Sequence, residues 1–430
     1  MSIEVYSPGF VLGAVYSEPS GSSSTTTAEL KVASVAPHRY TFAPAAIEGS
    51  KQYILSFSDD TSEQTGQTAL QVSIPLNADR ALRRRQWRQV PVAPSGNDSM
   101  GRLPAGPPAR AYEVMQGSQR WIVVLPTANT ADWMGSMPDS IRLGDLTIPG
   151  THESCALYGY PISQCQQPST DIAQQLVDGV RYLDVRLRAV GNDLLTYHGP
   201  RPQRSTIRRL LETIHGFLIS HPTETVILCL KEETPPSHPM FSELVYRHFQ
   251  PYRDEWFIEN RIPELRDVRG RGILMTRFEA AGGSWAGNMG IHPSTWPDSR
   301  KEGFVWDCAG TPFRIQDWYR VQSFLEIPEK FQAIIDHLAP TLNADPAHPF
   351  SLSYTSASSF PLSLPTTIAK GFGWPDWGMG VYGVNQRLAH WLLLRLIEGQ
   401  RVRACLAMDF YRQCGDDRGL AALLVSMNFV

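Results

Sequence analysis

The sequence predicts an α/β protein, a TIM-like (β/α) barrel in regular or distorted form, preceded by a small β-rich, sandwich-like domain. Three observations predict this fold. After Leu143, short apolar runs typical of buried strands alternate with stretches of helical periodicity. Many of these runs end in polar, chemically capable side chains, as barrel strands do at their carboxyl ends. Before about residue 131, short β-type runs are instead separated by turns rich in Ser, Thr, Gly and Pro.

These patterns divide the chain into a β-rich accessory domain, residues 1–131, and a barrel domain, residues 132–430. We expect the first to be a small antiparallel sandwich that acts as a stability cap, with a partner-binding or membrane-docking module as alternatives. Its expected strands are Val11–Tyr16, Leu30–Val35, Tyr53–Phe57, Ala69–Ile74, Tyr112–Met115 and Trp121–Leu125. A basic cluster around Trp87 is expected in a solvated strand or loop, with contact to anionic lipid heads as the alternative; it comprises Arg80, Arg83, Arg84, Arg85 and Arg88.

In the barrel domain, strands and helices are expected to follow one another. The apolar runs expected to be strands are Leu146–Ile148, Val180–Leu183, Leu194–Tyr197, Thr225–Leu230, Gly272–Thr276, Arg314–Tyr319, Phe350–Tyr354 and Ala404–Met408. The expected helices are Asp171–Asp178, a helix that Ser205 caps and that ends near Ser220, Phe241–Tyr252, Asn385–Leu396 and Leu420–Met427. A loop rich in Gly and Trp is expected at Gly371–Gly380.

Composition and charge argue against several classes of protein. The 39 basic and 42 acidic side chains give a formal net charge of −3, without the basic excess of a nucleic-acid binder. A transmembrane helix needs about 18 or more consecutive apolar residues, and the sequence has no such run. No N-terminal signal peptide is visible, so we expect a soluble protein, cytoplasmic or released without a recognisable signal, that is peripheral at membranes. The six cysteines show no zinc-type spacing, and the sequence leaves open whether Cys155 and Cys165 are bridged.

The stretch Leu146–Pro200 concentrates chemically capable residues at the ends of consecutive apolar runs. His152 follows the first run, Arg186 the second and His198 the third. One imidazole can remove a proton while the other supplies one, and a guanidinium can hold a phosphate by paired hydrogen bonds. Each of these residues taken alone is better explained as an ordinary partly buried histidine or as an Arg186–Asp184 pair. Together they predict acid–base cleavage of a phosphodiester without a metal.

Four pieces of sequence resemble one known family. They are IPGTHES, GVRYLDVR, YHGP and the segment HPTETVILCLKEE at His221–Glu233. In combination they resemble the catalytic X-region of the phosphatidylinositol-specific phospholipase C family, in its bacterial-type form. The resemblance extends more weakly to the C-terminus and so covers about Asp132 to Val430.

The resemblance implies a role for each matching residue. His152 is implied to be the general base that takes the proton of the inositol 2-hydroxyl, and His198 the general acid for the diacylglycerol oxygen. Arg186 is implied to hold the phosphate, with Asp184 orienting Arg186 and Asp409 orienting His152.

Further residues match less directly. The positions implied to bind the inositol ring are Lys231, Arg277, Asp317 and Tyr319. Bacterial relatives usually carry Asp directly after the first histidine, where this chain has Glu153. The carboxylate at this position is implied to support His198, and Glu153 would do so with a side chain that is one methylene longer.

The resemblance also bears on cofactors and on alternative functions. Calcium-dependent relatives have acidic ligands where this chain has Arg186 and Lys231, so no metal and no cofactor is expected. The alternatives are a metal-dependent phosphodiesterase of the glycerophosphodiesterase kind and a catalytically inactive inositol-lipid-binding protein. The sequence does not distinguish phosphatidylinositol from a glycosylphosphatidylinositol substrate, and the oligomeric state is unknown from it.

Two predicted loops carry apolar side chains suited to a membrane surface. Tyr158, Tyr160 and Ile162 follow the first histidine, and Phe372, Trp374 and Trp377 lie in the Gly- and Trp-rich loop. Tryptophan and tyrosine favour the membrane interface because they combine an apolar ring with a polar group. We therefore expect transient contact with a membrane surface, against the alternative that these rings pack into the core.

Overall fold

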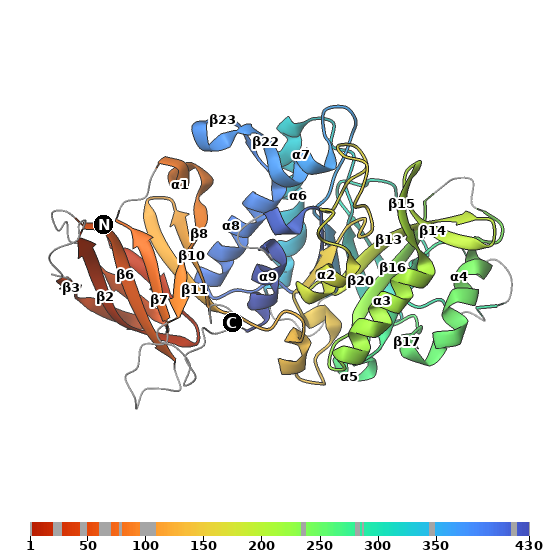
Figure 1. The fold of residues 1–430 in the computed structure, drawn as a ribbon, viewed down its shortest axis with the longest axis horizontal. Helices are drawn as coiled ribbons and strands as arrows, with labels where there is room; N and C mark the ends of the chain where they lie inside the picture. The colour runs from red at the N-terminus through yellow and green to blue at the C-terminus, as the bar shows by residue number, and fades with distance from the viewer. Residues whose placement is uncertain are drawn as a thin grey trace.

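The computed structural model of the chain describes residues 2–19, 28–43, 50–59, 70–76, 80–94, 109–233, 238–279, 284–285, 288–343, 349–413 and 419–429. Ala69, Cys414 and most of the Ser-, Thr-, Gly- and Pro-rich segments at 17–27 and 94–108 lie outside these ranges. The molecule is elongated, with β-rich layers at the N-terminal end and an α/β part at the other (Figure 1). The predicted fold class is confirmed in both parts.

Two sheets form the N-terminal part. One has the order β4-β5-β1-β11-β10-β8 and the other β3-β2-β6-β7-β9. The strands are β1 (Ile3–Tyr6), β2 (Phe10–Pro19), β3 (Ala28–Leu30), β4 (Val32–Ala36), β5 (Arg39–Phe42), β6 (Ser50–Asp59), β7 (Leu70–Pro75), β8 (Trp87–Val90), β9 (Val92–Pro94), β10 (Ala109–Gln116) and β11 (Gln119–Pro126). Alternate side chains such as Leu70, Val72 and Ile74 are buried in a common core.

The structure corrects three expectations for this part. The run expected at Leu30–Val35 is split between β3 and β4, which belong to different sheets. Strands β1 and β11 pair in parallel, so the sheets are not purely antiparallel. The arginine cluster expected in a strand or loop begins with a short helix, α1 (Arg80–Arg85), anchored by the buried side chain of Leu82. Arg88 is not simply solvated, because its guanidinium pairs with the buried Glu113 at 2.7 Å.

The second part is an open barrel. Its sheet has the order β17-β18-β16-β13-β12-β24-β21-β20-β19, and in the described ranges this path does not close into a ring. The strands are β12 (Ile148–Thr151), β13 (Tyr182–Val190), β16 (Val226–Glu232), β17 (Trp256–Phe257), β18 (Gly272–Arg277), β19 (Phe304–Cys308), β20 (Thr311–Gln316), β21 (Phe350–Tyr354) and β24 (Cys405–Met408). All neighbours on the path pair in parallel except β19 and β20. Parallel pairing brings the carboxyl ends of the strands to one mouth.

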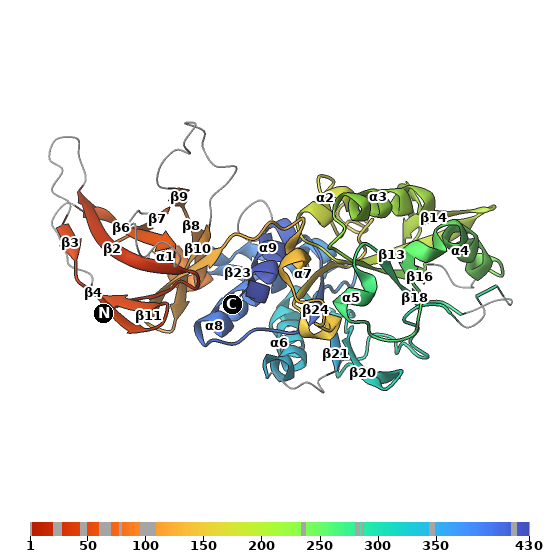
Figure 2. The same ribbon diagram turned by 90° about the horizontal axis from the view of Figure 1, so that it is seen from below.

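Helices cover the outside of this sheet (Figure 2). The α-helices are α2 (Ile172–Val177), α3 (Ile207–Ser220), α4 (Phe241–Phe249), α5 (Leu265–Val268), α6 (Ile327–Leu338), α7 (Pro365–Lys370), α8 (Val384–Ile397) and α9 (Gly419–Ser426). Short 3-10 helices are η2 (Trp133–Ser136), η3 (Leu143–Asp145), η4 (Gln250–Glu255), η5 (Phe324–Glu326), η6 (Ala339–Leu342), η7 (Pro375–Trp377), η8 (Tyr411–Gln413) and η9 (Met427–Phe429). The N-cap of α3 is Thr206 rather than the expected Ser205, and its side chain accepts a hydrogen bond from Arg209 N. None of the helices in the ranges above is both long and apolar enough to cross a membrane.

Two hairpins replace simpler elements that the sequence predicts. The run ending in His198 is not a barrel strand, because β14 (Asp193–His198) pairs antiparallel with the far end of β13 and with β15 (Arg201–Thr206). The expected loop at Gly371–Gly380 is a second hairpin, formed by β22 (Gly371–Trp374) and β23 (Met379–Tyr382) around η7.

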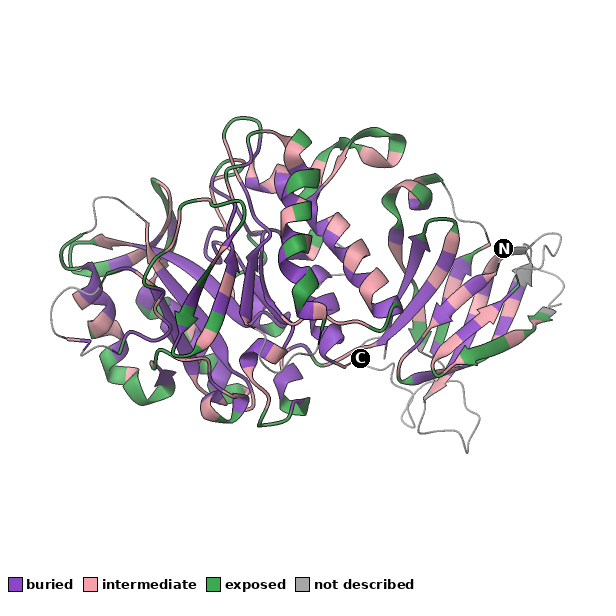
Figure 3. Ribbon diagram, turned by 180° about the vertical axis from the view of Figure 1, so that it is seen from behind, coloured by how far each residue is buried: buried purple, intermediate pink, exposed green. Residues whose placement is uncertain are grey.

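Helix α8 lies between the two parts of the molecule (Figure 1). Trp87 Nε1 donates to the carbonyl of Gln386 at 2.9 Å, and His390 Nε2 donates to the carbonyl of Met115 at 2.9 Å. Trp87 and Tyr112 also belong to the same hydrophobic cluster as the α8 residue Leu388. Buried segments therefore continue from the β-layers into the barrel (Figure 3), and a division into two domains near residue 131 stays a prediction.

A buried ion pair connects the segments that precede β13 and β16, at the end of the barrel opposite the mouth. Arg181 and Glu224 are both fully buried and lie 2.8 Å apart. Arg181 also donates to backbone carbonyls at Thr130 and Ala131, and Glu224 accepts from Met134 N. Every charge in this pair is compensated, so removing one partner leaves the other buried and unpaired.

We expect Glu224→Ala to lower the free energy of unfolding by about 3–5 kcal/mol, because the Arg181 guanidinium loses its counter-ion in the interior. Equilibrium unfolding in urea measures this loss. Glu302→Ala is the matched control, because the pair of Glu302 with Arg300 is exposed and its atoms lie 4.0 Å apart. The control should cost less than about 1 kcal/mol. Equal losses in the two variants would contradict the assignment of Arg181–Glu224 as a structural pair.

Candidate active site

The first histidine and its carboxylate come from adjacent parallel strands. Thr151 and Met408 are partners in the register of β12 and β24, so the residues that follow them, His152 and Asp409, lie side by side. His152 Nδ1 contacts Asp409 Oδ1 at 2.9 Å. A carboxylate there favours the tautomer with the proton on Nδ1, which leaves the lone pair on Nε2. Burial by itself would lower the pKa of His152, but the negative charge of Asp409 and its hydrogen bond raise it overall.

The guanidinium of Arg186 is held by carboxylates. Arg186 and Asp184 point to the same side of β13, and the arginine donates from Nε and Nη2 to the two oxygens of Asp184, each at 3.1 Å. Its Nη1 lies 3.5 Å from Glu153 and 3.5 Å from Glu233. Burial would raise the pKa of Asp184, but the charge of Arg186 holds it far below its usual value. Asp184 therefore stays ionised and orients the arginine.

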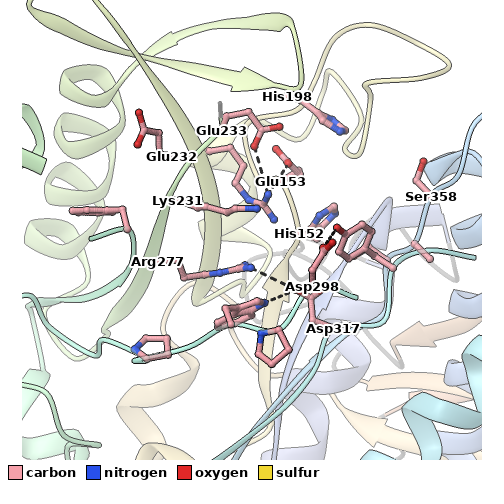
Figure 4. A pocket seen from close by; sticks show the side chains of 18 of the residues that line it. His152, Glu153, His198, Lys231, Glu232, Glu233, Arg277, Asp298, Asp317 and Ser358 are labelled. Carbon is pink, nitrogen blue, oxygen red and sulfur yellow. Dashed lines mark hydrogen bonds and ion pairs between the residues drawn. The ribbon is translucent and has the colours of Figure 1, made fainter. Parts of the chain in front are cut away.

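The second histidine reaches the mouth on the β14–β15 hairpin. His198 Nδ1 donates to the carbonyl of Ser163 at 2.9 Å, so its Nε2 is the nitrogen left for the pocket. Glu233 accepts a hydrogen bond from Gly199 N, which fixes the tip of the hairpin to the end of β16. Burial lowers the pKa of His198, and the charge of Glu233 opposes that shift. Both histidines face the same space (Figure 4).

Three cations stand next to one another on consecutive strands. Arg186 is the register partner of Lys231, and Lys231 is the register partner of Arg277. The positive charge of Arg186, followed by burial, lowers the pKa of Lys231 to about 8. This row gives the pocket a positive wall suited to an anionic group and to hydroxyl oxygens.

Aromatic and acidic side chains complete the opposite part of the pocket. The guanidinium of Arg277 lies over the ring of Trp296, 3.5 Å from its centroid, and Trp296 Nε1 donates to Asp317 at 2.8 Å. The hydroxyl of Tyr319 donates to Asp298. Trp296 and Asp317 thus form one fixed group with Arg277, the last cation of the row.

These side chains line one cavity of about 800 Å³. Of the predicted catalytic and substrate-binding residues, those lining it are His152, Glu153, Arg186, His198, Lys231, Arg277, Asp317, Tyr319 and Asp409. Asp184 lies behind Arg186 and acts on the cavity through it. The volume is in the range of pockets that take a small organic molecule.

Comparison with known proteins identifies the family. Residues 149–278 match the family described as phosphatidylinositol-specific phospholipase C, X domain. This segment is similar to a phosphatidylinositol-specific phospholipase C X domain and makes up less than a third of the chain. A 1-phosphatidylinositol phosphodiesterase of Listeria monocytogenes is 34% identical over 163 residues, which cover 35% of this chain and 50% of that protein. A protein of the same name from Staphylococcus aureus is 24% identical, over 44% of this chain and 64% of that protein.

Solved structures show the same fold. The phosphatidylinositol-specific phospholipase C of Listeria monocytogenes aligns with a TM-score of 0.53 and 25% identity, over 70% of this chain and 99% of that chain. A Staphylococcus aureus enzyme of that name aligns with a TM-score of 0.56 and 18% identity, over 69% of this chain and 97% of that chain. In sequence, the chain spans only about half the length of the Listeria relative.

The residues matched to the X domain include only part of the site. The remaining lining residues come from later segments of the barrel. Asp317, Tyr319 and Asp409 lie beyond the matched residues and reach the cavity from β20 and β24. Sequence reasoning gave no role to Glu233, Trp296 or Asp298. Glu233 had a usable signal, because it follows Lys231 by two residues and therefore points to the same side of a strand.

Glu153 behaves differently from the expectation that it supports His198. Its carboxylate lies 3.5 Å from Arg186, and Glu233 is the carboxylate whose charge acts most on His198. Burial raises the pKa of Glu153 to about 8; Arg186 opposes the shift and the nearby charge of Glu233 adds to it. The X domain therefore holds Glu153 in its neutral form at neutral pH.

The residues expected at the membrane are mostly exposed. Trp374 and Trp377 are 68% and 78% exposed, Tyr160 is 72% exposed, and Ile162 and Phe372 are also exposed. Tyr158 is the exception, because it is only partly exposed and its ring lies under the guanidinium of Arg204 at 4.2 Å. Tyr158 therefore packs against the β14–β15 hairpin rather than pointing outward.

Cys155 and Cys165, for which the sequence left open whether they are bridged, are both free thiols and both buried. Cys165 lies behind the two histidines, with its sulfur 3.7 Å from His198 Nδ1. Cys229 and Cys405 are buried within strands, as expected for small apolar side chains.

The raised pKa of Glu153 predicts a pH dependence of stability. Between pH 4.5 and about 8 the folded protein keeps a proton that the unfolded chain loses, so this group lowers the free energy of unfolding as pH rises. Glu153→Gln has no carboxyl group to titrate at this position, so this decrease should be absent from it. Its free energy of unfolding should exceed that of the wild type, by about 2–5 kcal/mol toward the upper end of this pH range. Urea unfolding at a series of pH values measures it.

Glu279→Gln is the control for this series, because Glu279 also lines the cavity but is exposed. Its free energy of unfolding should change with pH in the same way as that of the wild type. The same pH dependence for Glu153→Gln as well would mean that Glu153 is ionised in the folded protein.

Proposed function

We propose that this chain cleaves phosphatidylinositol, or a glycosylphosphatidylinositol, to diacylglycerol and inositol 1,2-cyclic phosphate without a metal ion. The observation that carries the proposal is that His152, with Asp409 behind it, His198 and Arg186 all line one cavity. The names of the Listeria and Staphylococcus relatives, 1-phosphatidylinositol phosphodiesterase, support the same reaction.

Proton transfer follows from the two histidines. Nε2 of His152 takes the proton of the inositol 2-hydroxyl, and that oxygen attacks the phosphorus. The bond from phosphorus to the diacylglycerol oxygen breaks, and protonated His198 gives its proton to the departing oxygen. Asp409 raises the pKa of His152, which favours accepting a proton, whereas burial lowers the pKa of His198, which favours giving one.

Arg186 stabilises the charge that develops on the phosphate. Nε and Nη2 are occupied by Asp184, so Nη1 is the donor directed toward Glu153 and Glu233. A neutral Glu153 competes less with a phosphate for this donor than an ionised one would. The raised pKa of Glu153 thus leaves Arg186 with excess positive charge for the substrate.

The site favours this reaction over the two alternatives. A metal-dependent phosphodiesterase needs several oxygen ligands for a hard cation, whereas Arg186, Lys231 and Arg277 place three positive charges along the same wall. A lipid-binding protein without activity would not need Asp409 and the Ser163 carbonyl to fix Nδ1 of both histidines, which leaves Nε2 of His152 and of His198 for the cavity. Turnover distinguishes an enzyme from a binder.

We expect the purified protein to convert phosphatidylinositol vesicles to inositol 1,2-cyclic phosphate in the presence of EDTA, followed by ³¹P NMR. His152→Ala and His198→Ala should each lower turnover by about 10²–10⁴-fold, because each removes a proton-transfer group. Arg186→Lys should be comparably severe, because a point charge cannot replace a planar guanidinium held by two hydrogen bonds.

His238→Ala is the matched control, because His238 is exposed and does not line the cavity. It should leave turnover unchanged. Activity that is lost in EDTA and restored by Ca²⁺ would contradict the proposal, and so would near-normal turnover of Arg186→Lys.

We also propose that the rim of the cavity is the surface that contacts the membrane. The β22–β23 hairpin lies in the connection after β21, on the same side as the mouth. Other exposed apolar side chains follow the carboxyl ends of β12, β20 and β21; they are Tyr160, Ile162, Leu325, Phe360 and Leu362. Exposed apolar groups concentrated around one opening are typical of a membrane or partner contact.

The N-terminal part supports this hairpin. Arg85 at the end of α1 pairs with Asp376 in η7, and the Tyr382 hydroxyl donates to the same aspartate at 2.8 Å. A side chain at Gly378 would collide with the guanidinium of Arg84. The basic helix α1 therefore lies directly beside the exposed tryptophans, which suits an anionic lipid surface.

We expect the double variant Trp374→Ala, Trp377→Ala to bind phosphatidylinositol-containing vesicles at least about tenfold more weakly, because two large exposed rings no longer enter the interface. Sedimentation with vesicles measures binding. Hydrolysis of soluble inositol 1,2-cyclic phosphate should be spared, because neither ring lines the cavity.

Ile219→Ala is the control, since Ile219 is 78% exposed near the end of α3, just before the amino end of β16. It should not change vesicle binding. Unchanged binding in the tryptophan variant would place the contact elsewhere on the molecule.

A further inference from the structure

Three side chains that can bind a metal lie close together at the cavity. One ligand atom each of His152, Cys165 and Asp409 lies within 4.8 Å of the other two. The three residues come from the turn after β12, the loop before α2 and the tip of β24. The proposed reaction uses two of them and gives Cys165 no role.

The position of Cys165 is fixed by its neighbours. Its backbone carbonyl accepts from Phe410 N at 2.9 Å, next to Asp409, and its backbone N donates to Ala156. The adjacent Gln166 side chain donates to the carbonyls of His152 and Met408 at 2.9 and 2.8 Å. The thiol is therefore held close to both catalytic strand ends by the main chain.

A second observation concerns Asp409. Only its Oδ1 contacts His152, whereas its Oδ2 is buried and has no hydrogen-bond partner in the structure. The side chain is almost fully buried, and a buried carboxylate oxygen without a partner is costly. A cation bound between Asp409 and Cys165 would satisfy this oxygen.

We propose that His152, Cys165 and Asp409 form a binding site for a thiophilic divalent cation such as Zn²⁺, and that its occupation switches the enzyme off. His198 could join the set only by exchanging its hydrogen bond to the Ser163 carbonyl for the metal, because the Nδ1 that lies 3.7 Å from the Cys165 sulfur is the same nitrogen that donates to this carbonyl. Zinc binds N, O and S ligands at about 2.0–2.3 Å, so two ligand atoms on one tetrahedral zinc are roughly 3.3–3.8 Å apart. The cluster needs only a small contraction to reach that geometry.

Binding exchanges protons for the metal. The S–H bond of Cys165 breaks, a sulfur–zinc bond forms, and the proton leaves to solvent. Affinity therefore rises with pH, and hard cations such as Ca²⁺ and Mg²⁺, which prefer oxygen ligands, bind poorly.

The consequence for activity rests on the proposed function. A metal that engages His152 and Asp409 removes the base and the carboxylate that orients it. Zinc and cadmium should therefore inhibit, a chelator should preserve or restore the rate, and calcium should have no effect.

Metal binding is tested first without any measurement of activity. Co²⁺ added to the metal-free wild-type protein should produce a near-ultraviolet thiolate-to-cobalt charge-transfer absorption. Cys165→Ser should lack it, whereas Cys155→Ser, which removes the other buried thiol of the same loop, should keep it. Absence of the band in the wild type, or its persistence in Cys165→Ser, would overturn the site.

Inhibition is tested next on phosphatidylinositol vesicles, with each rate normalised to that variant's own metal-free rate. Saturating Zn²⁺ should lower the wild-type rate at least about tenfold, and Cys165→Ser should raise the half-inhibitory concentration by about 10–100-fold, as for the loss of a metal-supporting group. Equal zinc sensitivity in the two proteins would overturn the switch.

Two measurements separate the possible failures. Zinc-edge X-ray absorption of the wild-type protein detects sulfur in the coordination shell even if Cys165→Ser does not fold, and a shell without sulfur would overturn the proposal. A cobalt band in a protein that does not cleave phosphatidylinositol would refute the proposed function and leave the metal site standing.

Discussion

The buried guanidinium of Arg186 is the interaction on which the mouth of the barrel depends. A cation in this position must be compensated, because an unpaired buried charge costs several kcal/mol. The carboxyl groups that contact it come from three segments: the ionised Asp184 from β13, Glu153, whose raised pKa keeps it protonated, from the turn after β12, and Glu233 from the end of β16. One buried charge thus holds three neighbouring elements in register around the reaction centre.

The same charges connect the segments that carry His152 and His198. Glu153 directly follows His152, so the contact of Glu153 with Arg186 also fixes the turn that presents the base. Glu233 contacts Arg186 on one side and the main chain of Gly199 on the other, which fixes the hairpin that presents His198. The environments then push the two imidazoles in opposite directions, with the pKa of His152 raised and that of His198 lowered. Two identical side chains acquire different tasks through their surroundings.

Around this polar centre the rim is apolar, and it draws on both parts of the chain. The β22–β23 hairpin carries exposed tryptophans, and its turn is tied by Asp376 to Arg85 of the N-terminal part. Helix α8, which follows the hairpin, packs against β10 and β8 through Trp87 and His390. The β-rich part therefore contributes to the position of a surface element of the barrel as well as to its packing.

The sequence by itself determined the fold class and many of the residues that line the cavity. Strand tips such as His152 and Asp409 could be assigned because a polar residue directly after a buried apolar run belongs to the carboxyl end of a strand, whatever its neighbours are. The assignment of the run before His198 to the barrel was wrong, since apolar periodicity does not reveal whether a strand pairs in parallel or antiparallel. Only the tertiary structure decided that a hairpin brings His198 back over β13, that Trp296 covers Arg277, and that Cys165 lies behind the two histidines. The first of these depends on local antiparallel pairing of neighbouring strands. The other two join residues from separate segments, and their geometry depends on how loops cross the mouth, which no local pattern encodes.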